Sequence, residues 1–186
     1  MGKLIYTLNV SLDGFVETRD HSPAWASADD ELLMWFNHRA RGLDASIYGR
    51  RLYELMAAYW PTAESDPSAT GAMREFARIW NQTPKVVFST TLASVAGNSR
   101  LVRGDVGDEL ARLRTEFHGD LEVGGPTLAS AFIRRGLVDE YQLLVHPVIL
   151  GGGTPFFPTL ETPTRLRHKE AHRFDSGVVY LGYTAV

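Results

Sequence analysis

The order of hydrophobic patterns along the 186-residue chain predicts an α/β fold: a central, mainly parallel sheet, an antiparallel C-terminal hairpin, and helices on both faces. Strand-like and helix-like stretches alternate as far as residue 136, which is the order that produces parallel strands. Beyond residue 136, strand-like stretches follow one another, as in a hairpin. Hydrophobic residues make up 44% of the chain and charged residues 22%, which is typical of a globular domain, so we expect one domain over residues 1–186.

Periodicity and turn residues define the elements of the first half of the chain. Residues 3–10 are partly alternating and partly continuously apolar, which is typical of a central strand. Negative charges at 29–31 favour a helix start, and Gly42 ends the apolar stripe that follows. The remaining expected elements are a loop over 11–28, a strand over 45–48, a helix over 50–58, a loop over 61–71 and a strand over 85–89.

The second half is expected to contain two helices and several strands. Apolar residues at helical spacing predict a helix over 106–117. A strand over 121–123 ends on two glycines, Pro126 favours a helix start, and Gly136 ends that helix. The last expected elements are a strand or strand pair over 138–150 and strands near 164–173 and 178–186.

Composition excludes several classes of function. The net charge of −3 argues against a nucleic-acid binder that works by neutralising phosphates. The chain has no cysteine, and therefore no disulfide, thiolate nucleophile or zinc–thiolate site. No apolar run approaches the ~20 residues that cross a bilayer, and no signal-peptide pattern opens the chain, so we expect a cytoplasmic protein. On a strand, His168 and His172 would lie about 13 Å apart, so no metal site is expected.

A strand, two glycines and a helix follow one another over residues 121–135. Gly124 and Gly125 would let the backbone approach a ligand closely, and the N–H groups at the start of the following helix attract anions. The other interpretation is a tight turn that needs a positive φ. Neither a G-x-G-x-x-G nor a P-loop motif is present, so this element by itself favours neither interpretation.

A second junction of this kind is Tyr48-Gly49-Arg50-Arg51. Arginine in a first helical turn opposes the helix dipole, and a bound phosphate would explain its presence there. The other interpretation is a solvated pair of arginines. Two such junctions in one α/β domain suggest a ligand with more than one phosphate.

Asp13 follows the first strand in the sequence Ser11-Leu12-Asp13-Gly14. A carboxylate at the C-terminal edge of a parallel sheet lies where open α/β folds bind ligands. The other interpretation is an ordinary Asp-Gly turn, in which the side chain accepts hydrogen bonds from nearby backbone.

Four segments together resemble the dihydrofolate-reductase-like superfamily, and within it the reductase domain of riboflavin biosynthesis. They are NVSLDGF, YGRRLYE, NQTPKVVFSTTL and LEVGGPTLASAFIRRGLVDEYQLLVHPVILGGGTPFF, and in this order they extend over nearly the whole chain. The resemblance implies an NADPH site, a small-molecule substrate and a homodimer.

The resemblance also assigns roles to individual residues. It places Gly49, Arg50 and Arg51 at the adenosine phosphates, and Thr7 to Asn9 at the nicotinamide. Asp13 would lie at the substrate end, orienting the substrate or delivering a proton through water. The other implied cofactor residues are Ser89, Thr90 and Thr91 at the adenosine end, and Gly124, Gly125, Pro126 and Thr127 at the pyrophosphate.

Two positions depart from the family's pattern. Leu52 stands where many members have a cofactor-binding threonine, and the helix acid of dihydrofolate reductases has no counterpart three residues before Trp35, where Leu32 lies. Asp29, Asp30 and Glu31 lie earlier in that helix. We therefore expect an NADPH-dependent reductase of a pterin-like or aminopyrimidine-like heterocycle, with the segment 14–28 as a candidate lid; the alternative is a nucleotide-binding protein of this fold without turnover.

Overall fold

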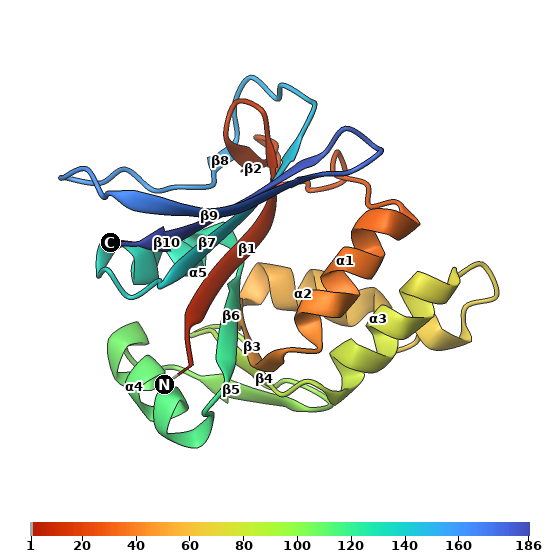
Figure 1. Ribbon diagram of the computed structural model, residues 1–186. Helices are drawn as coiled ribbons and strands as arrows, with labels where there is room; N and C mark the ends of the chain where they lie inside the picture. Colours follow the sequence, from red (N-terminus) through yellow and green to blue (C-terminus); the bar gives the residue numbers. More distant parts are fainter. Residues whose placement is uncertain (1) are drawn as a thin grey trace.

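The computed structural model describes residues 2–186 and confirms the predicted fold class (Figure 1). Eight strands form one sheet in the order β5-β4-β3-β6-β1-β7-β10-β9. The strands from β5 to β7 in this order are parallel, whereas β10 is antiparallel to both β7 and β9. The strands are β1 (Leu4–Ser11), β3 (Leu43–Gly49), β4 (Lys85–Phe88), β5 (Ser99–Val102), β6 (Asp120–Gly124), β7 (Glu140–His146), β9 (Leu166–Arg173) and β10 (Val179–Ala185).

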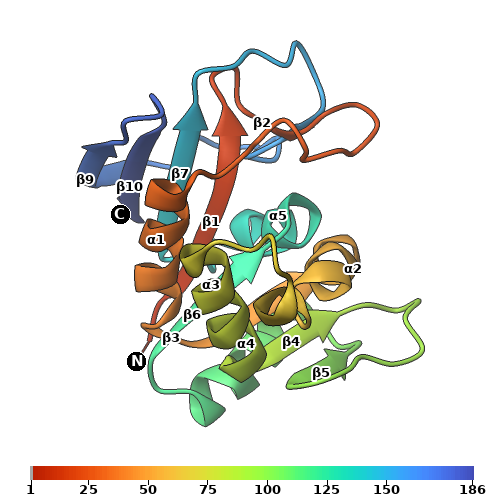
Figure 2. The same ribbon diagram turned by 90° about the vertical axis from the view of Figure 1, so that its right-hand side faces the viewer.

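Helices cover both faces of the sheet, as predicted. Figure 1 shows α1, α2 and α3 on one side of β1 and β6, and α4 and α5 on the other. Figure 2 shows α1 and α3 side by side in front of the sheet. The helices are α1 (Asp30–Ala40), α2 (Arg50–Tyr59), α3 (Gly71–Gln82), α4 (Val106–Glu116) and α5 (Pro126–Arg134), with a short 3-10 helix η1 (Ala63–Ser65).

Alternation along the central strands separates two environments. On β6, Leu121 and Val123 join the large apolar core that α4 and α5 cover. Glu122, between them, faces the side of α1, α2 and α3. The same holds on β1, where Tyr6 belongs to the core under α5 and Thr7 faces the other side. The α1–α3 side of the sheet therefore carries polar groups in its middle.

Several elements differ from the sequence-based expectation. Two short strands, β2 (Phe15–Glu17) and β8 (Thr154–Pro155), pair in a small second sheet; β2 lies in the segment 11–28 that was expected to be a loop, and β8 lies where no element was expected. Helix α3 and strand β5 were not among the elements expected from the sequence. The α3 helix follows directly on a loop-like stretch, and β5 is a short edge strand with little buried surface. Helix α1 ends at Ala40, close to the expected stop at Gly42, and β3 begins at Leu43.

None of the helices in residues 2–186 is long and apolar enough to span a bilayer.

Candidate functional site

Two adjoining hollows lie against the parallel strands, one along a face of the sheet and the other at the edge where these strands end. The first, which we call the α1–α3 cavity, has a volume of about 360 Å³ and lies between the sheet and helices α1, α2 and α3. The second, the α2–α5 groove, has a volume of about 530 Å³ and lies between the N-termini of α2 and α5. The two share a wall of apolar residues: Leu8, Val16, Pro23, Leu52 and Leu55.

The α2–α5 groove contains two helix N-termini without side-chain caps. Asp29, Thr70 and Asp105 cap α1, α3 and α4 with their side chains. Within residues 2–186, the two α-helices that lack such a cap are α2 and α5, which begin after Gly49 and Gly125, and both glycines line the groove. Unpartnered N–H groups at a helix start attract anions. The groove therefore has two adjacent sites for negative charge.

Arg51 connects the two helix starts across this groove. Its Nη2 donates to the Thr127 hydroxyl at 3.1 Å, and its Nη1 lies 3.4 Å from the carboxylate of Glu17. Arg50, one residue earlier, lies 3.4 Å from Glu54 on the same helix and also lines the groove. The structure thus brings Gly49, both arginines and the predicted residues 125–127 to one place.

Local structure favours glycine at both positions before α5, Gly124 and Gly125, whether or not a ligand binds. Gly125 has a φ of 95°, which favours glycine whatever ligand is bound. A Cβ on Gly124 would lie 2.7 Å from Leu52 Cδ2 and 3.1 Å from the Tyr48 ring, so a larger residue there would displace these side chains. The positive φ at Gly125 confirms the interpretation as a tight turn, and the anion site at the same junction stays a prediction.

Ser89, Thr90 and Thr91 lie at the same edge of the sheet but outside the groove. Phe88, which precedes them, is in register with Gly49 and lines the groove. The Ser89 hydroxyl accepts hydrogen bonds from the backbone N–H of Thr91 at 3.2 Å and of Leu92. These residues therefore form a turn next to the start of α2, and their contact with a cofactor stays a prediction.

The α1–α3 cavity has mostly apolar and aromatic walls. Tyr48 of the sheet contributes one aromatic side chain, and the other aromatic side chains come from the helices: Phe36 of α1, Trp60 just after α2, and Phe76 and Trp80 of α3. Sequence analysis missed the last two because it assigned no helix over 71–82, although Thr70 and the apolar residues that follow it at helical spacing are a usable signal. Such walls fit a flat, apolar ring.

Polar side chains lie in a row across the floor of this cavity. Ser46 of β3 is in register with Lys85 of β4 on one side and with Glu122 of β6 on the other. On the next strand, β1, the Thr7 hydroxyl donates to Gln142 at 3.1 Å. Ser46, Lys85, Glu122 and Thr7 line the cavity, whereas Gln142 does not. No sequence motif marks Lys85 or Glu122, and each is recognisable only as a charged residue within an apolar strand.

The two charged groups of this row have shifted pKa values. The Lys85 side chain is 2% exposed, and its burial lowers the pKa of the ammonium group to about 8. Its Nζ donates to the carbonyl groups of Trp80 and Thr83. Burial raises the pKa of the Glu122 carboxyl, and the smaller effects of the Thr7 hydroxyl and the Arg39 guanidinium oppose this. Perturbed groups in a cleft are typical of functional sites.

Thr7 and Asn9, predicted at the nicotinamide, line the α1–α3 cavity next to its shared wall. Asn9 Oδ1 lies 2.9 Å from Nε2 of His146, on the neighbouring strand β7. Burial lowers the pKa of His146, which packs edge-on against Trp25. A neutral imidazole that donates through Nε2 fixes the Asn9 amide, so that its N–H groups are free for a ligand.

Asp13 does not line either hollow. Its carboxylate accepts hydrogen bonds from the Ser11 hydroxyl at 2.6 Å and from the backbone N–H groups of Leu150 and Gly151 at 3.0 and 2.7 Å. The Ser11 hydrogen bond is the main cause of its lowered pKa, and the two backbone N–H groups act in the same direction. Both oxygens therefore hold the loop after β7, as in the alternative interpretation of a structural turn, and a role of Asp13 at the substrate end stays a prediction.

The three acids at the start of α1 are also engaged in structural contacts. Asp29 caps the helix through the N–H of Leu32, Asp30 accepts from the Thr70 hydroxyl, and Glu31 accepts from the backbone of Asp175. None of the three lines the α1–α3 cavity. Within residues 2–186, no group of three or more potential metal ligands comes together.

The sequence matches the family model described as the RibD C-terminal domain over residues 2–180. The uncharacterized protein YyaP of Bacillus subtilis (strain 168) is 31% identical to this chain over 182 residues, which cover 97% of this chain and 94% of YyaP.

Solved structures show the same fold. A putative riboflavin biosynthesis protein from Shewanella sp. PV-4 is similar over 99% of both chains, with a TM-score of 0.78 and 20% identity. A diaminohydroxyphosphoribosylaminopyrimidine deaminase/5-amino-6-(5-phosphoribosylamino)uracil reductase from Thermotoga maritima is similar over all of this chain but only 57% of its own, with a TM-score of 0.68 and 14% identity. This chain therefore spans little more than half of that bifunctional protein.

Proposed function

Because the chain belongs to the RibD C-terminal domain family, we propose that it is an NADPH-dependent reductase that transfers hydride to a small nitrogen heterocycle. The observation that carries this proposal is the shared wall between the α2–α5 groove and the α1–α3 cavity. A groove that fits phosphates adjoins a cavity that fits a flat ring. The phosphates of a dinucleotide require a site such as the groove. Hydride transfer requires the reactive ring of the dinucleotide to lie beside the substrate, which the cavity would hold.

The residues of the groove fit the phosphates of a dinucleotide. The uncapped starts of α2 and α5 would each donate backbone N–H groups, and Arg51 would replace its contact with Glu17 by one with phosphate. Thr127, already held by Arg51, adds a hydroxyl at the start of α5. Arg50 and the turn of residues 89–91 lie beside each other at the outer end and would bind the 2′-phosphate.

When bound, NADPH supplies a hydride from its nicotinamide ring. Asn9, with its orientation fixed by His146, would hold the carboxamide of that ring, and Thr7 would line the same pocket. The segment 14–28 contributes Val16, Pro23 and Ala26 to the cavity and Glu17 and His21 to the groove. It therefore covers both hollows and would exclude water from the transfer.

A nucleotide-binding protein without turnover is the second candidate, and Leu52 is the observation that favours it. Leu52 stands where related proteins carry a cofactor-binding threonine, and it forms part of the shared wall. An apolar side chain there gives the cofactor no hydrogen bond.

The rate of NADPH oxidation against a panel of dihydropterins and aminopyrimidine ribosides separates the two candidates. Turnover that depends on one compound and is much slower with NADH supports the reductase. NADPH binding without oxidation by any member of the panel would favour the second candidate, and failure to bind NADPH would exclude both.

The homodimer implied by the resemblance stays a prediction. Light scattering that gives twice 20.7 kDa at micromolar concentrations would support it, and a mass of 20.7 kDa would reject it.

A further inference from the structure

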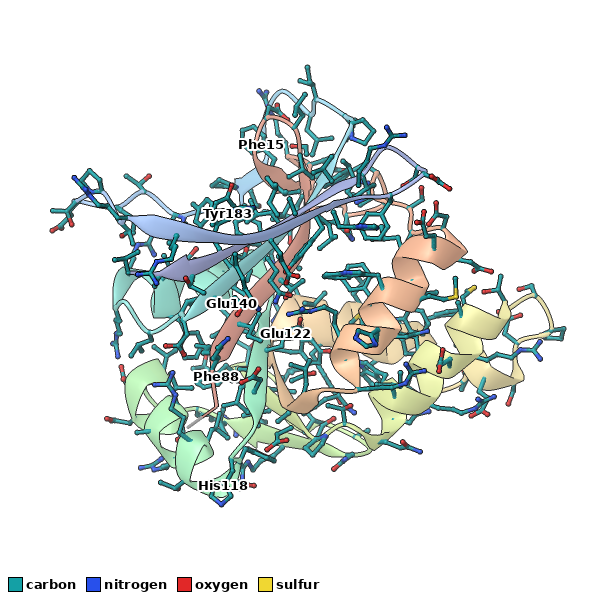
Figure 3. All side chains as sticks on the ribbon, in the orientation of Figure 1. Phe15, Phe88, His118, Glu122, Glu140 and Tyr183 are labelled. Carbon is teal, nitrogen blue, oxygen red and sulfur yellow. The ribbon has the colours of Figure 1, made fainter. Side chains whose placement is uncertain are left out.

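Glu122 occupies a central position in the sheet, on the side of helices α1, α2 and α3. It lies on β6, between Ile5 of β1 and Ser46 of β3, and Figure 3 labels it near the middle of the molecule. Among residues 2–186 it is the only carboxyl side chain that lines the α1–α3 cavity. The three acids of α1 and Asp13 are engaged elsewhere, so Glu122 is the acid that a ligand in this cavity meets.

The position of Glu122 along β6 sets its distance from the proposed nicotinamide site. Glu122 is in register with Ile5 of β1, and Asn9, which is proposed to hold the nicotinamide, lies four residues further along β1 on the cavity wall. Four residues of a strand span about 13 Å, which leaves room for a flat ring between the nicotinamide and the carboxyl. A flat ring placed between them would have one edge at the nicotinamide and the other at Glu122.

Glu122 forms no ion pair with a charged side chain of residues 2–186, so its carboxyl is available to a ligand. The Thr7 hydroxyl donates to Gln142 at 3.1 Å and also lies close enough to Glu122 to affect its pKa, and Arg39, on α1, is 3.7 Å from Glu140. Lys85, two strands away, is tied to backbone carbonyl groups. Burial raises the pKa of Glu122, which favours the protonated carboxyl. A protonated carboxyl donates a hydrogen bond and can transfer its proton.

We infer that Glu122 recognises the ring of a planar nitrogen heterocycle in the α1–α3 cavity and donates the proton that completes reduction of a C=N bond. This inference rests on the proposed reductase function. It places the substrate acid on strand β6 instead of on the first helix, where the resemblance had suggested one.

The reaction balances with groups that the proposal names. The carbon of the C=N bond accepts a hydride as NADPH is oxidised to NADP⁺, and the C=N double bond becomes a single bond. The ring nitrogen takes the proton of the Glu122 carboxyl, leaving a carboxylate, which water reprotonates after the product leaves.

The first test measures binding of pterin in the absence of NADPH. Trp60 and Trp80 line the cavity, so a ring that stacks there should quench the fluorescence of the wild-type protein. Glu122→Gln keeps a hydrogen-bond donor and should bind pterin within about threefold of the wild type, whereas Glu122→Leu loses the donor and should weaken binding by about tenfold. Glu116→Gln, which removes only an exposed ion pair on α4, is the matched control.

The second test separates recognition from proton transfer. With dihydropterin and NADPH, Glu122→Gln should lower kcat by about 10²-fold or more while KM changes little, because an amide cannot supply the proton. NADPH affinity, measured separately, should be the same in all four proteins. An infrared difference spectrum between the wild type and Glu122→Gln at neutral pH should show the C=O band of a protonated carboxyl.

Three results would overturn the inference. They are no quenching by pterin at millimolar concentration, equal binding of pterin by the wild type and the leucine variant, and a carboxylate band in place of the protonated one. Failure of NADPH to bind would instead contradict the proposed function, while the pterin titration and the infrared spectrum would still decide whether Glu122 recognises the ring.

Discussion

The α2–α5 groove and the α1–α3 cavity share a wall of apolar residues but are lined by different chemical groups. The groove presents backbone N–H groups from two helix starts together with the guanidinium of Arg51. The cavity presents aromatic side chains from three helices above a floor with one available carboxyl, Glu122. This difference fits the proposed division of a cofactor and its substrate between the two hollows. Charged phosphates would bind in the groove, where backbone dipoles and solvent stabilise them, and the reacting rings would lie in the cavity, where water is excluded.

The largest expected effect concerns Lys85 and tests whether the floor of the cavity is a low-dielectric environment. An unfolded lysine keeps its proton to about pH 10.5, whereas burial lowers the pKa of Lys85 to about 8 in the folded protein. Between these values the unfolded chain binds more protons, so the free energy of unfolding should rise with pH. The rise should approach about 3 kcal/mol.

Lys85→Met removes this titration while keeping the length of the side chain. Urea unfolding from pH 7 to 10.5 should therefore show the rise in the wild type and not in the variant. If the free energy of unfolding changed with pH in the same way in both proteins, the floor of the cavity would be as well solvated as the groove. That result would contradict the difference between the two hollows.

Arg51→Ala tests the groove. Because Arg51 is expected at the pyrophosphate, which both cofactors carry, NADPH and NADH should each bind about ten- to a hundredfold more weakly, as a lost charged hydrogen bond costs about 1.5–3 kcal/mol. Arg50→Ala should weaken only NADPH, because only NADPH carries the 2′-phosphate. Fluorescence titration of both cofactors measures this. An equal loss of NADPH and NADH in the Arg50 variant would move that residue away from the 2′-phosphate.

Gly125→Ala tests the part of the groove that depends on backbone conformation. A residue with a Cβ is strained at a φ of 95°, so the variant should lose about 1–3 kcal/mol of stability even without a cofactor. Gly136→Ala, at a φ of 64° after α5 with open space around it, is the matched comparison for positive φ away from the groove. A Gly125 variant of unchanged stability and unchanged NADPH affinity would contradict both interpretations of this junction.

The smallest effect is expected for Asp13→Asn, which lies outside both hollows. The amide can still accept one hydrogen bond, so the loop at Leu150 and Gly151 should loosen only slightly. Hydrogen exchange of those two backbone amides should become faster, while kcat and NADPH affinity stay within about twofold of the wild type, less than the loss of one hydrogen bond. A large loss of kcat with unchanged loop exchange would support the catalytic role expected from the sequence.

The sequence could predict the groove because its parts are adjacent in the chain. Each strand–glycine–helix junction is a continuous segment, and the rule that parallel strands end at one edge places the two junctions together. The cavity could not be predicted in this way. Its walls come from three helices, one of them unassigned, and Glu122 is a single acid between Leu121 and Val123 whose meaning depends on which face of β6 it occupies.

Asp13 shows the converse. Its position after a central strand is typical of a ligand-binding carboxylate, and an Asp-Gly turn is typical of a structural one. The outcome depended on Leu150 and Gly151, more than 130 residues away, whose N–H groups occupy both oxygens. No local pattern contains that information.

The most direct test of the central claim, that the groove and the cavity serve one dinucleotide and one substrate, is a crystal structure of the protein with NADP⁺ bound. We expect the pyrophosphate at the start of α5 against Arg51 and Thr127, and the nicotinamide beside Asn9, facing the α1–α3 cavity with Glu122 beyond it. A dinucleotide whose nicotinamide points away from that cavity, or one bound outside the α2–α5 groove, would contradict the account.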